Sequence, residues 1–200
     1  MKPIVILHEG NDKSSLDNKL VKNLIEHLKL DEKDADKEFK KIKFYGMGVK
    51  SNFFNANFVV YRELIQRIAD YEISNIFFIL DADNCNKNQG GLIKTQEKLQ
   101  AMIKSLGWEE ISSFYITHDP QTEHKEGFIE SLLLSTIPQD KKECIDKFLE
   151  CFGFIAKDGD KSTYERIYKS IAHPLPPYNF DHPHFDELKQ KLRSLFITDL

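Results

Sequence analysis

Acidic residues follow two apolar segments of this chain in a pattern that suits metal chemistry. The first apolar run, Ile4–Leu7, is followed by His8 and then by Glu9. Asp81 and Asp83 follow the apolar run that ends at Leu80. Carboxylate oxygens are the ligands that Mg²⁺ prefers, usually with water and a substrate phosphate completing its shell. Without a cation, three clustered carboxylates would repel one another and raise at least one pKa. The residue types therefore predict a site for Mg²⁺ or Mn²⁺.

The elements expected around these residues would bring them together. Four short apolar runs have the composition of buried strands: Ile4–Leu7, Ile42–Tyr45, Asn75–Leu80 and Ile111–Thr117. Three segments between them have helical periodicity: 16–28, 58–69 and 92–106. This alternation predicts an α/β fold, a compact and mostly parallel sheet of about four strands with helices on both faces. The carboxyl ends of parallel strands share one edge, where ligands bind, so Glu9 and the two aspartates should converge there.

The second part of the chain has a different pattern. After Gly127 the strand pattern ends, and helices are expected at 128–134, 144–152, 164–171 and 188–196. We therefore expect an α/β domain over residues 1–120. Residues 121–200 would form a C-terminal helical extension that packs on the same core.

Composition and charge narrow the classes of protein. The 200 residues include 15 Phe and 7 Tyr, which argues against intrinsic disorder. No apolar run approaches the ~18 residues of a membrane span, and the N-terminal apolar run is too short for a signal peptide. A cytoplasmic protein without a membrane partner is expected. The net charge of −4 means that binding to nucleic acid would need a local patch, a metal ion or another protein.

The segments that end in these acids resemble the Toprim domain of primases, topoisomerases and OLD-family nucleases. Ile4-Val5-Ile6-Leu7-His8-Glu9-Gly10 and Phe77-Phe78-Ile79-Leu80-Asp81-Ala82-Asp83 carry the resemblance. Gly127-Phe128-Ile129-Glu130 is similar to a helix start in small stand-alone Toprim-like proteins. The resemblance implies that Glu9 is a general acid/base or a metal ligand and that Asp81 and Asp83 hold Mg²⁺ or Mn²⁺. It also implies that Glu130 adds a ligand for a second ion.

Several further residues are candidates at the same edge. Relatives often carry an acid four residues after the first Glu, but here that position is Lys13, and Asp12 precedes it. Asp12 is therefore the candidate metal ligand, and the second ion stays open. Gly10 would let the backbone approach a substrate, and phosphate contacts are expected from the polar residues Lys13, Lys87 and His118. An ordinary turn glycine, solvated lysines and a structural histidine are the alternatives. The lysines at 37, 40, 41, 43 and 50 are interpreted as a solvated face.

These residues together lead to one expected function and two alternatives. The expectation is a protein that uses Mg²⁺ or Mn²⁺ for phosphoryl transfer or phosphodiester hydrolysis on nucleic acid or a nucleotide. A non-catalytic module that binds a nucleotide or a partner protein is the first alternative. The second is a glycosyltransferase that uses a nucleotide-sugar, because Phe77–Asn84 also resembles the Asp-x-Asp segment of those enzymes. Whether the protein is an enzyme, and its oligomeric state, stay open.

Overall fold

A four-stranded parallel sheet forms the centre of the computed structural model, which describes residues 3–11, 15–34, 38–85, 90–151 and 179–197. The strands are β1 (Ile4–His8), β2 (Ile42–Gly46), β3 (Asn75–Asp81) and β4 (Ser112–Thr117). They lie in the order β2-β1-β3-β4, so β1 and β3 are central and all four carboxyl ends meet at one edge. This confirms the α/β fold predicted from the alternation of strands and helices.

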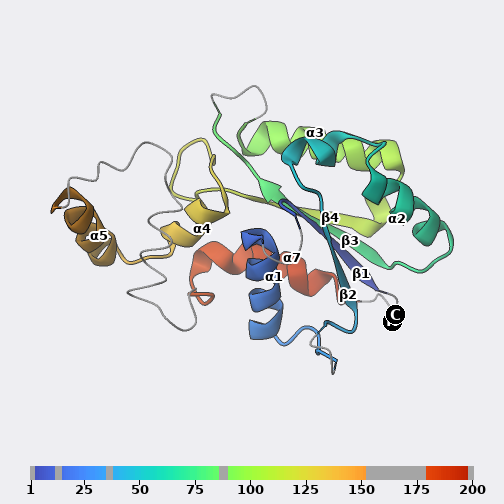
Figure 1. Ribbon diagram of the computed structural model, residues 1–200, viewed down its shortest axis with the longest axis horizontal. Helices are drawn as coiled ribbons and strands as arrows, with labels where there is room; N and C mark the ends of the chain where they lie inside the picture. The colour runs from blue at the N-terminus through green and yellow to red at the C-terminus, as the bar shows by residue number, and fades with distance from the viewer. Residues whose placement is uncertain (1–2, 12–14, 35–37, 86–89, 152–178, 198–200) are drawn as a thin grey trace.

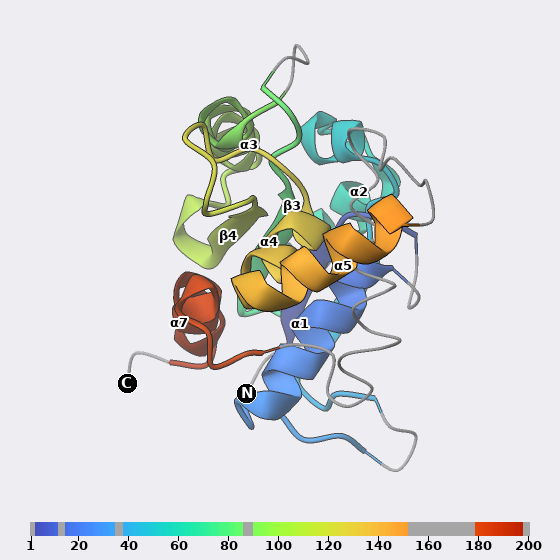
Figure 2. The ribbon, with the colours of Figure 1, turned by 90° about the vertical axis from the view of Figure 1, so that its left-hand side faces the viewer.

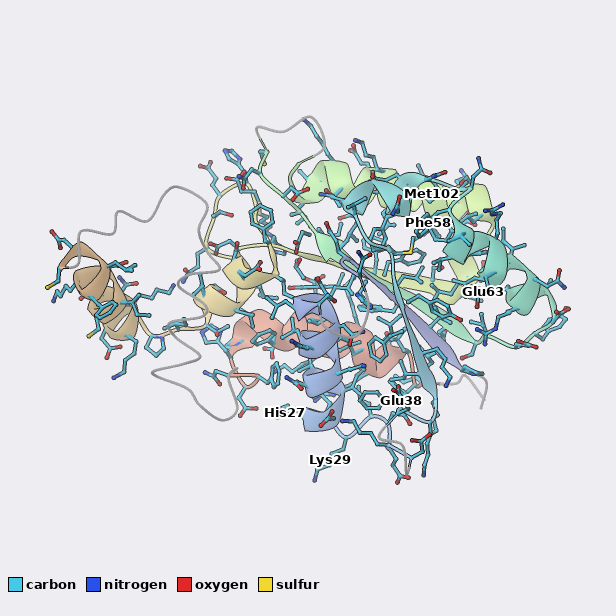
Figure 3. All side chains as sticks on the ribbon, viewed as in Figure 1. His27, Lys29, Glu38, Phe58, Glu63 and Met102 are labelled. Atoms are coloured by element: carbon cyan, nitrogen blue, oxygen red, sulfur yellow. The ribbon has the colours of Figure 1, made fainter. Side chains whose placement is uncertain are left out.

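Helices cover both faces of the sheet, as Figure 1 shows. α2 (Val59–Ala69) and α3 (Leu92–Leu106) lie on one face, and α1 (Leu16–His27) and α7 (Asp186–Ser194) lie on the other. Alternate residues of β1 serve the two layers, because successive side chains of a strand point to opposite faces. Val5 and Leu7 belong to the core under α2 and α3, whereas Ile4 and Ile6 belong to the core under α1 and α7. In Figure 3, Phe58 and Met102 lie in the α2–α3 layer and His27 lies on the opposite side.

Two helices of the second part of the chain stand near the carboxyl edge of the sheet. α4 (Ile129–Ser135) and α5 (Gln139–Cys151) come forward in Figure 2, which looks toward that edge. α4 contributes Ile129, Leu132 and Leu133 to the core under α1. α5 instead packs into a small cluster with Ile137. α5 begins five residues before the expected helix at 144–152, and the helix expected at 164–171 falls outside the described residues.

Short 3-10 turns connect these elements: η2 (Lys50–Phe54), η3 (Glu109–Ile111) and η5 (Pro183–Phe185). The ends of the helices follow local sequence. The Ser15 hydroxyl caps α1 by accepting from the Asn18 N–H at 3.2 Å, and α3 ends at Gly107 in the left-handed region (φ 69°). Of the helices in the described ranges, none combines the length and the apolar character needed to cross a bilayer.

Candidate metal centre

The ends of the two central strands bring the first pair of predicted residues together. β1 and β3 are in register with His8 opposite Ile79, so Glu9 lies beside the last residues of β3. The Asp81 backbone N–H donates to Glu9 Oε2 at 3.3 Å. Glu9 is half-buried, and burial is the main cause that raises the pKa of its carboxyl, with a smaller contribution from the Asp83 charge. The carboxyl edge thus joins Glu9 and Asp81 across 72 residues of sequence.

The Asp81 side chain is held from two further elements. Its Oδ1 accepts a hydrogen bond from the Thr117 hydroxyl at the end of β4 and another, at 2.8 Å, from the Ile129 N–H at the start of α4. Burial raises the pKa of Asp81 well above its usual range, and the negative charges of Asp17, Glu9 and Glu130 add to the rise. Burial and this repulsion favour the protonated form of Asp81, whereas a bound cation would favour the ionised form.

Asp17, in the first turn of α1, is a fourth carboxylate that the sequence interpretation missed. Its residue is 7% exposed, and among the described residues its Oδ1 has no hydrogen-bond partner. Burial, followed by the charge of Glu9, raises the pKa of Asp17 to about 8. Glu130, in the first turn of α4, contributes a smaller repulsion. We call Glu9, Asp17, Asp81 and Glu130 the acidic cluster.

Asp83, the second residue of the predicted Asp-x-Asp pair, has a basic partner. Lys50 Nζ donates to Asp83 Oδ2 at 3.0 Å and to the Ala82 carbonyl at 2.9 Å. The charge and the backbone N–H of Lys50 also lower the pKa of Glu9. Lys50 is only 8% exposed, so its interpretation as part of a solvated face is wrong. The turn after β2 folds inward over the sheet edge and buries this lysine.

Gly10 shapes the turn that follows β1. Its φ is +87°, a conformation that favours glycine, and its N–H donates to the Gly48 carbonyl at 2.8 Å. The Gly48 N–H returns a bond of 3.0 Å to the Gly10 carbonyl. A Cβ on Gly10 would lie 2.7 Å from the Ser15 Cβ. Gly10 thus ties the end of β1 to the turn that carries Lys50, and a role for it in substrate binding stays a prediction.

Of the remaining predicted residues, the structure describes one, His118, and places it outside the acidic cluster. His118 is buried, donates from Nδ1 to the Ile116 carbonyl at 2.8 Å, and lines a cavity of about 220 Å³ between α3, β4 and α7. That cavity is lined by Lys125 and Lys191 rather than by the acidic cluster. The predicted residues Asp12, Lys13 and Lys87 fall outside the described residues.

The acidic cluster fits a hard divalent cation by its chemistry but is not preassembled around one. Its donors are carboxylate oxygens, the ligands of Mg²⁺ and Mn²⁺. In the described part of the chain, no three His, Cys, Asp or Glu side chains are arranged to ligate a metal ion together. Asp81 Oδ1 is directed at Thr117 and Ile129 instead. A cation bound here would require carboxylates of the cluster to rotate toward it.

A positional signal in the sequence identifies both missed residues. The helix after a parallel strand begins at the carboxyl edge of the sheet, so Asp17 in the first turn of α1 lies at that edge. An acidic residue in the first turn of a helix commonly stabilises the helix dipole, so its presence there does not by itself indicate a functional site. Lys50 follows the end of β2 by the same rule, because η2 begins four residues after Gly46.

Comparisons with known proteins add no relative to this picture. The chain matches no family model, no curated protein and no solved structure. The Toprim resemblance accordingly stays a prediction, and an assignment of function starts from the acidic cluster and the Lys50–Asp83 pair.

Proposed function

We propose that this protein uses Mg²⁺ or Mn²⁺ at the acidic cluster for phosphoryl transfer or phosphodiester hydrolysis on nucleic acid or a nucleotide. The observation that carries the proposal is the buried Asp17 Oδ1, which has no hydrogen-bond partner among the described residues although other carboxylates surround it. An unpaired buried acceptor costs about 1–3 kcal/mol, and more when it is charged. A cation at this place would remove both that cost and the repulsion.

The position of the cluster supports the same proposal. Ligands of parallel α/β sheets bind at the carboxyl ends of the strands, and Glu9 and Asp81 stand at the ends of the two central strands. Glu130 and Asp17 join them from the first turns of two helices. Together these elements would place a bound cation where a substrate phosphate can reach it.

Glu9 is suited to move a proton at this site. A general acid or base works best when its pKa is near the working pH, and burial shifts the pKa of Glu9 upward in that direction. The Asp81 N–H holds its carboxylate in place, and this bond and the Lys50 charge both limit the rise of the pKa. Glu9 would accept a proton from the attacking water or hydroxyl through a carboxylate oxygen, while Asp81 and Asp17 would hold the cation.

A bound Mg²⁺ or Mn²⁺ would supply the electrophilic chemistry, because it polarises a phosphoryl oxygen and lowers the pKa of a bound water. The chain's own residues would orient the substrate and exchange protons with it. The net charge of −4 also makes a cation useful, since a polyanionic substrate is otherwise repelled.

A binding module without catalysis is the second candidate, and one observation favours it. The Asp81 Oδ1 is already satisfied by Thr117 and Ile129, so the fold has a use for this carboxylate that needs no metal ion. In that case a nucleotide or partner protein would still bind after Asp81 is neutralised.

The test is a calorimetric titration of Mn²⁺ into the wild-type protein and into Asp81→Asn, with parallel incubation of both with plasmid, single-stranded DNA and RNA. We expect saturable binding that weakens at least ~10-fold in Asp81→Asn, together with loss of substrate cleavage. Glu9→Gln should retain most Mn²⁺ binding and lose ~10²–10⁴-fold in rate.

The control is Asp70→Asn, which neutralises an exposed aspartate at the end of α2 and should change neither quantity. Absence of saturable Mn²⁺ binding to the wild type, with and without nucleic acid, would refute the proposal. Cation binding without turnover of any substrate would support the binding module.

A further inference from the structure

Lys50 places a fixed positive charge beside the acidic cluster. It begins η2, and its ammonium is enclosed, with Nζ 3.0 Å from Asp83 Oδ2 and 2.9 Å from the Ala82 carbonyl. A buried ammonium is strongly destabilising unless an anion accompanies it. The enclosed Lys50 ammonium therefore depends on Asp83, the carboxylate that accompanies it.

The main chain fixes Asp83 in this role. Its φ is +60°, its N–H donates to the Gly127 carbonyl at 2.8 Å, and its own carbonyl accepts from the Gly127 N–H at 3.1 Å. Because both backbone groups are tied to the segment before α4, Asp83 cannot move far without breaking this bridge. Its side chain remains 25% exposed, so the Lys50–Asp83 pair borders solvent while its lysine is enclosed.

The two sides of the centre differ in their need for positive charge. On one side Lys50 and Asp83 neutralise each other, and the lysine charge also lowers the pKa of Glu9. On the other side, the buried Asp17 Oδ1 has no hydrogen-bond partner among the described residues, and the charges that act on Asp17 and Asp81 are those of other carboxylates. A divalent ion gains most on the second side, whereas on the first it would have to displace a buried ammonium.

We propose that the Lys50 ammonium occupies the position that a second divalent cation would take on Asp83, so that the centre binds one divalent ion, on the side of Asp17 and Asp81. This inference rests on the proposed function. Two-ion phosphoryl centres use their ions to stabilise the attacking and the leaving oxygen. In this chain one of those two positive charges would belong to a lysine.

The test counts the Mn²⁺ ions bound per chain, from the electron paramagnetic resonance signal of free Mn²⁺ during a titration. The wild type should bind one ion. Lys50→Met should bind two, because the Asp83 carboxylate it releases needs a cation. The double variant Lys50→Met/Asp83→Asn removes both charges of the pair and should again bind one ion, with an affinity within about threefold of the wild type.

The control is Lys40→Met, which removes an exposed lysine paired with Glu32 at 2.8 Å and should leave one ion bound. Two ions on the wild type, or one on Lys50→Met, would overturn the inference and leave the proposed function standing. Loss of the ion in the double variant would also overturn it, because Asp83 would then be a ligand. If Lys50→Met does not fold, the double variant decides, since it leaves no buried charge unpaired. A wild type that binds no ion refutes the proposed function itself.

Discussion

Asp17 shows how a single buried carboxyl couples the stability of this protein to pH. Its pKa is about 8 in the folded protein, against an ordinary value of 3.8, with burial as the first cause and the Glu9 charge as the second. Between these two values the folded chain holds a proton that the unfolded chain has released. Stability from this group is therefore complete below about pH 4 and falls as the pH rises toward 8.

Asp17→Asn tests this coupling without any metal. At about pH 8.5 in EDTA the variant should be more stable than the wild type by roughly 1–3 kcal/mol, because a neutral amide avoids the charge repulsion. At about pH 5 that advantage should be smaller, because the destabilisation from Asp17 grows with each pH unit between about 4 and 8. Urea unfolding at the two pH values measures the difference.

The matched control is Asp140→Asn, which changes an exposed aspartate in the first turn of α5. It should shift stability by at most a few tenths of a kcal/mol, alike at both pH values. Equal destabilisation of Asp17→Asn at both pH values would contradict the assignment.

Thr117 is a second residue whose effect should reach the cation. Its hydroxyl bonds Asp81 and lowers the pKa of that carboxyl, so Thr117→Val should leave a proton more firmly on Asp81. We expect Mn²⁺ affinity near pH 7 to fall by roughly 10-fold, the usual size for a residue that orients a metal ligand. Thr136→Val removes a similar buried hydroxyl, bonded to the Leu133 carbonyl at 2.7 Å, and should leave the affinity unchanged in the same calorimetric titration.

At the scale of elements, the turns after β1 and β2 decide which side chains enter the centre. The paired hydrogen bonds of Gly10 and Gly48 join the two turns, and both glycines have positive φ. This bridge lies between the strand that carries Glu9 and the turn that carries Lys50. The bridge between the two turns, rather than any one side chain, therefore sets the distance between Glu9 and Lys50.

Gly10→Ala tests the bridge. The added Cβ would lie 2.7 Å from Ser15 Cβ at a φ of +87°, so we expect a loss of about 1–3 kcal/mol in unfolding free energy together with weaker Mn²⁺ binding. Gly107→Ala is the matched control, because its φ is +69° but nothing lies within 4 Å of the added Cβ. It should cost about 1 kcal/mol and leave the titration unchanged. Equal titrations for the two variants would show that the bridge does not position the centre.

Strand ends were predictable from the sequence, whereas the inward course of the turns was not. Apolar runs identify buried parallel strands, and the shared carboxyl edge then joins Glu9 to Asp81 without further information. The sequence places Lys50 after the end of β2, at the same edge of the sheet. Whether its side chain turns inward depends on a turn closed by Gly10 and Gly48, and a sequence pattern does not show which way such a turn folds. The start of α5 was misplaced because its first turn, from Gln139 to Glu143, is polar and hides the helical period.

At the scale of the whole molecule, the part of the chain after the sheet completes the core on one face. α7 buries Leu188 and Leu192 beside α1, and Phe185 just before it is fully enclosed. The Asn75 side-chain amide at the start of β3 donates to the Leu195 carbonyl at 3.0 Å, so α7 is also tied to the central strands. Among the residues that the structure describes, α5 by contrast packs with a few apolar side chains.

Two leucine substitutions measure this difference in packing. Leu192→Ala, in the main core, should lower the unfolding free energy by about 2–5 kcal/mol. Leu149→Ala in α5, which is 6% exposed within the small cluster, should cost less because its surroundings can collapse into the space more easily. Denaturant midpoints compare the two, and equal losses would mean that α5 is as integral to the core as α7.

The hydrogen bond from the Ile129 N–H to Asp81 has a consequence for how this protein can diverge. The donor belongs to the main chain, so any residue except proline can supply it. The side chain at position 129 needs only to fit the core around it. Drift in residue identity at position 129 would therefore leave the bond to Asp81 intact. A search of diverged sequences by residue type would recover the carboxylates and overlook the groups that aim them.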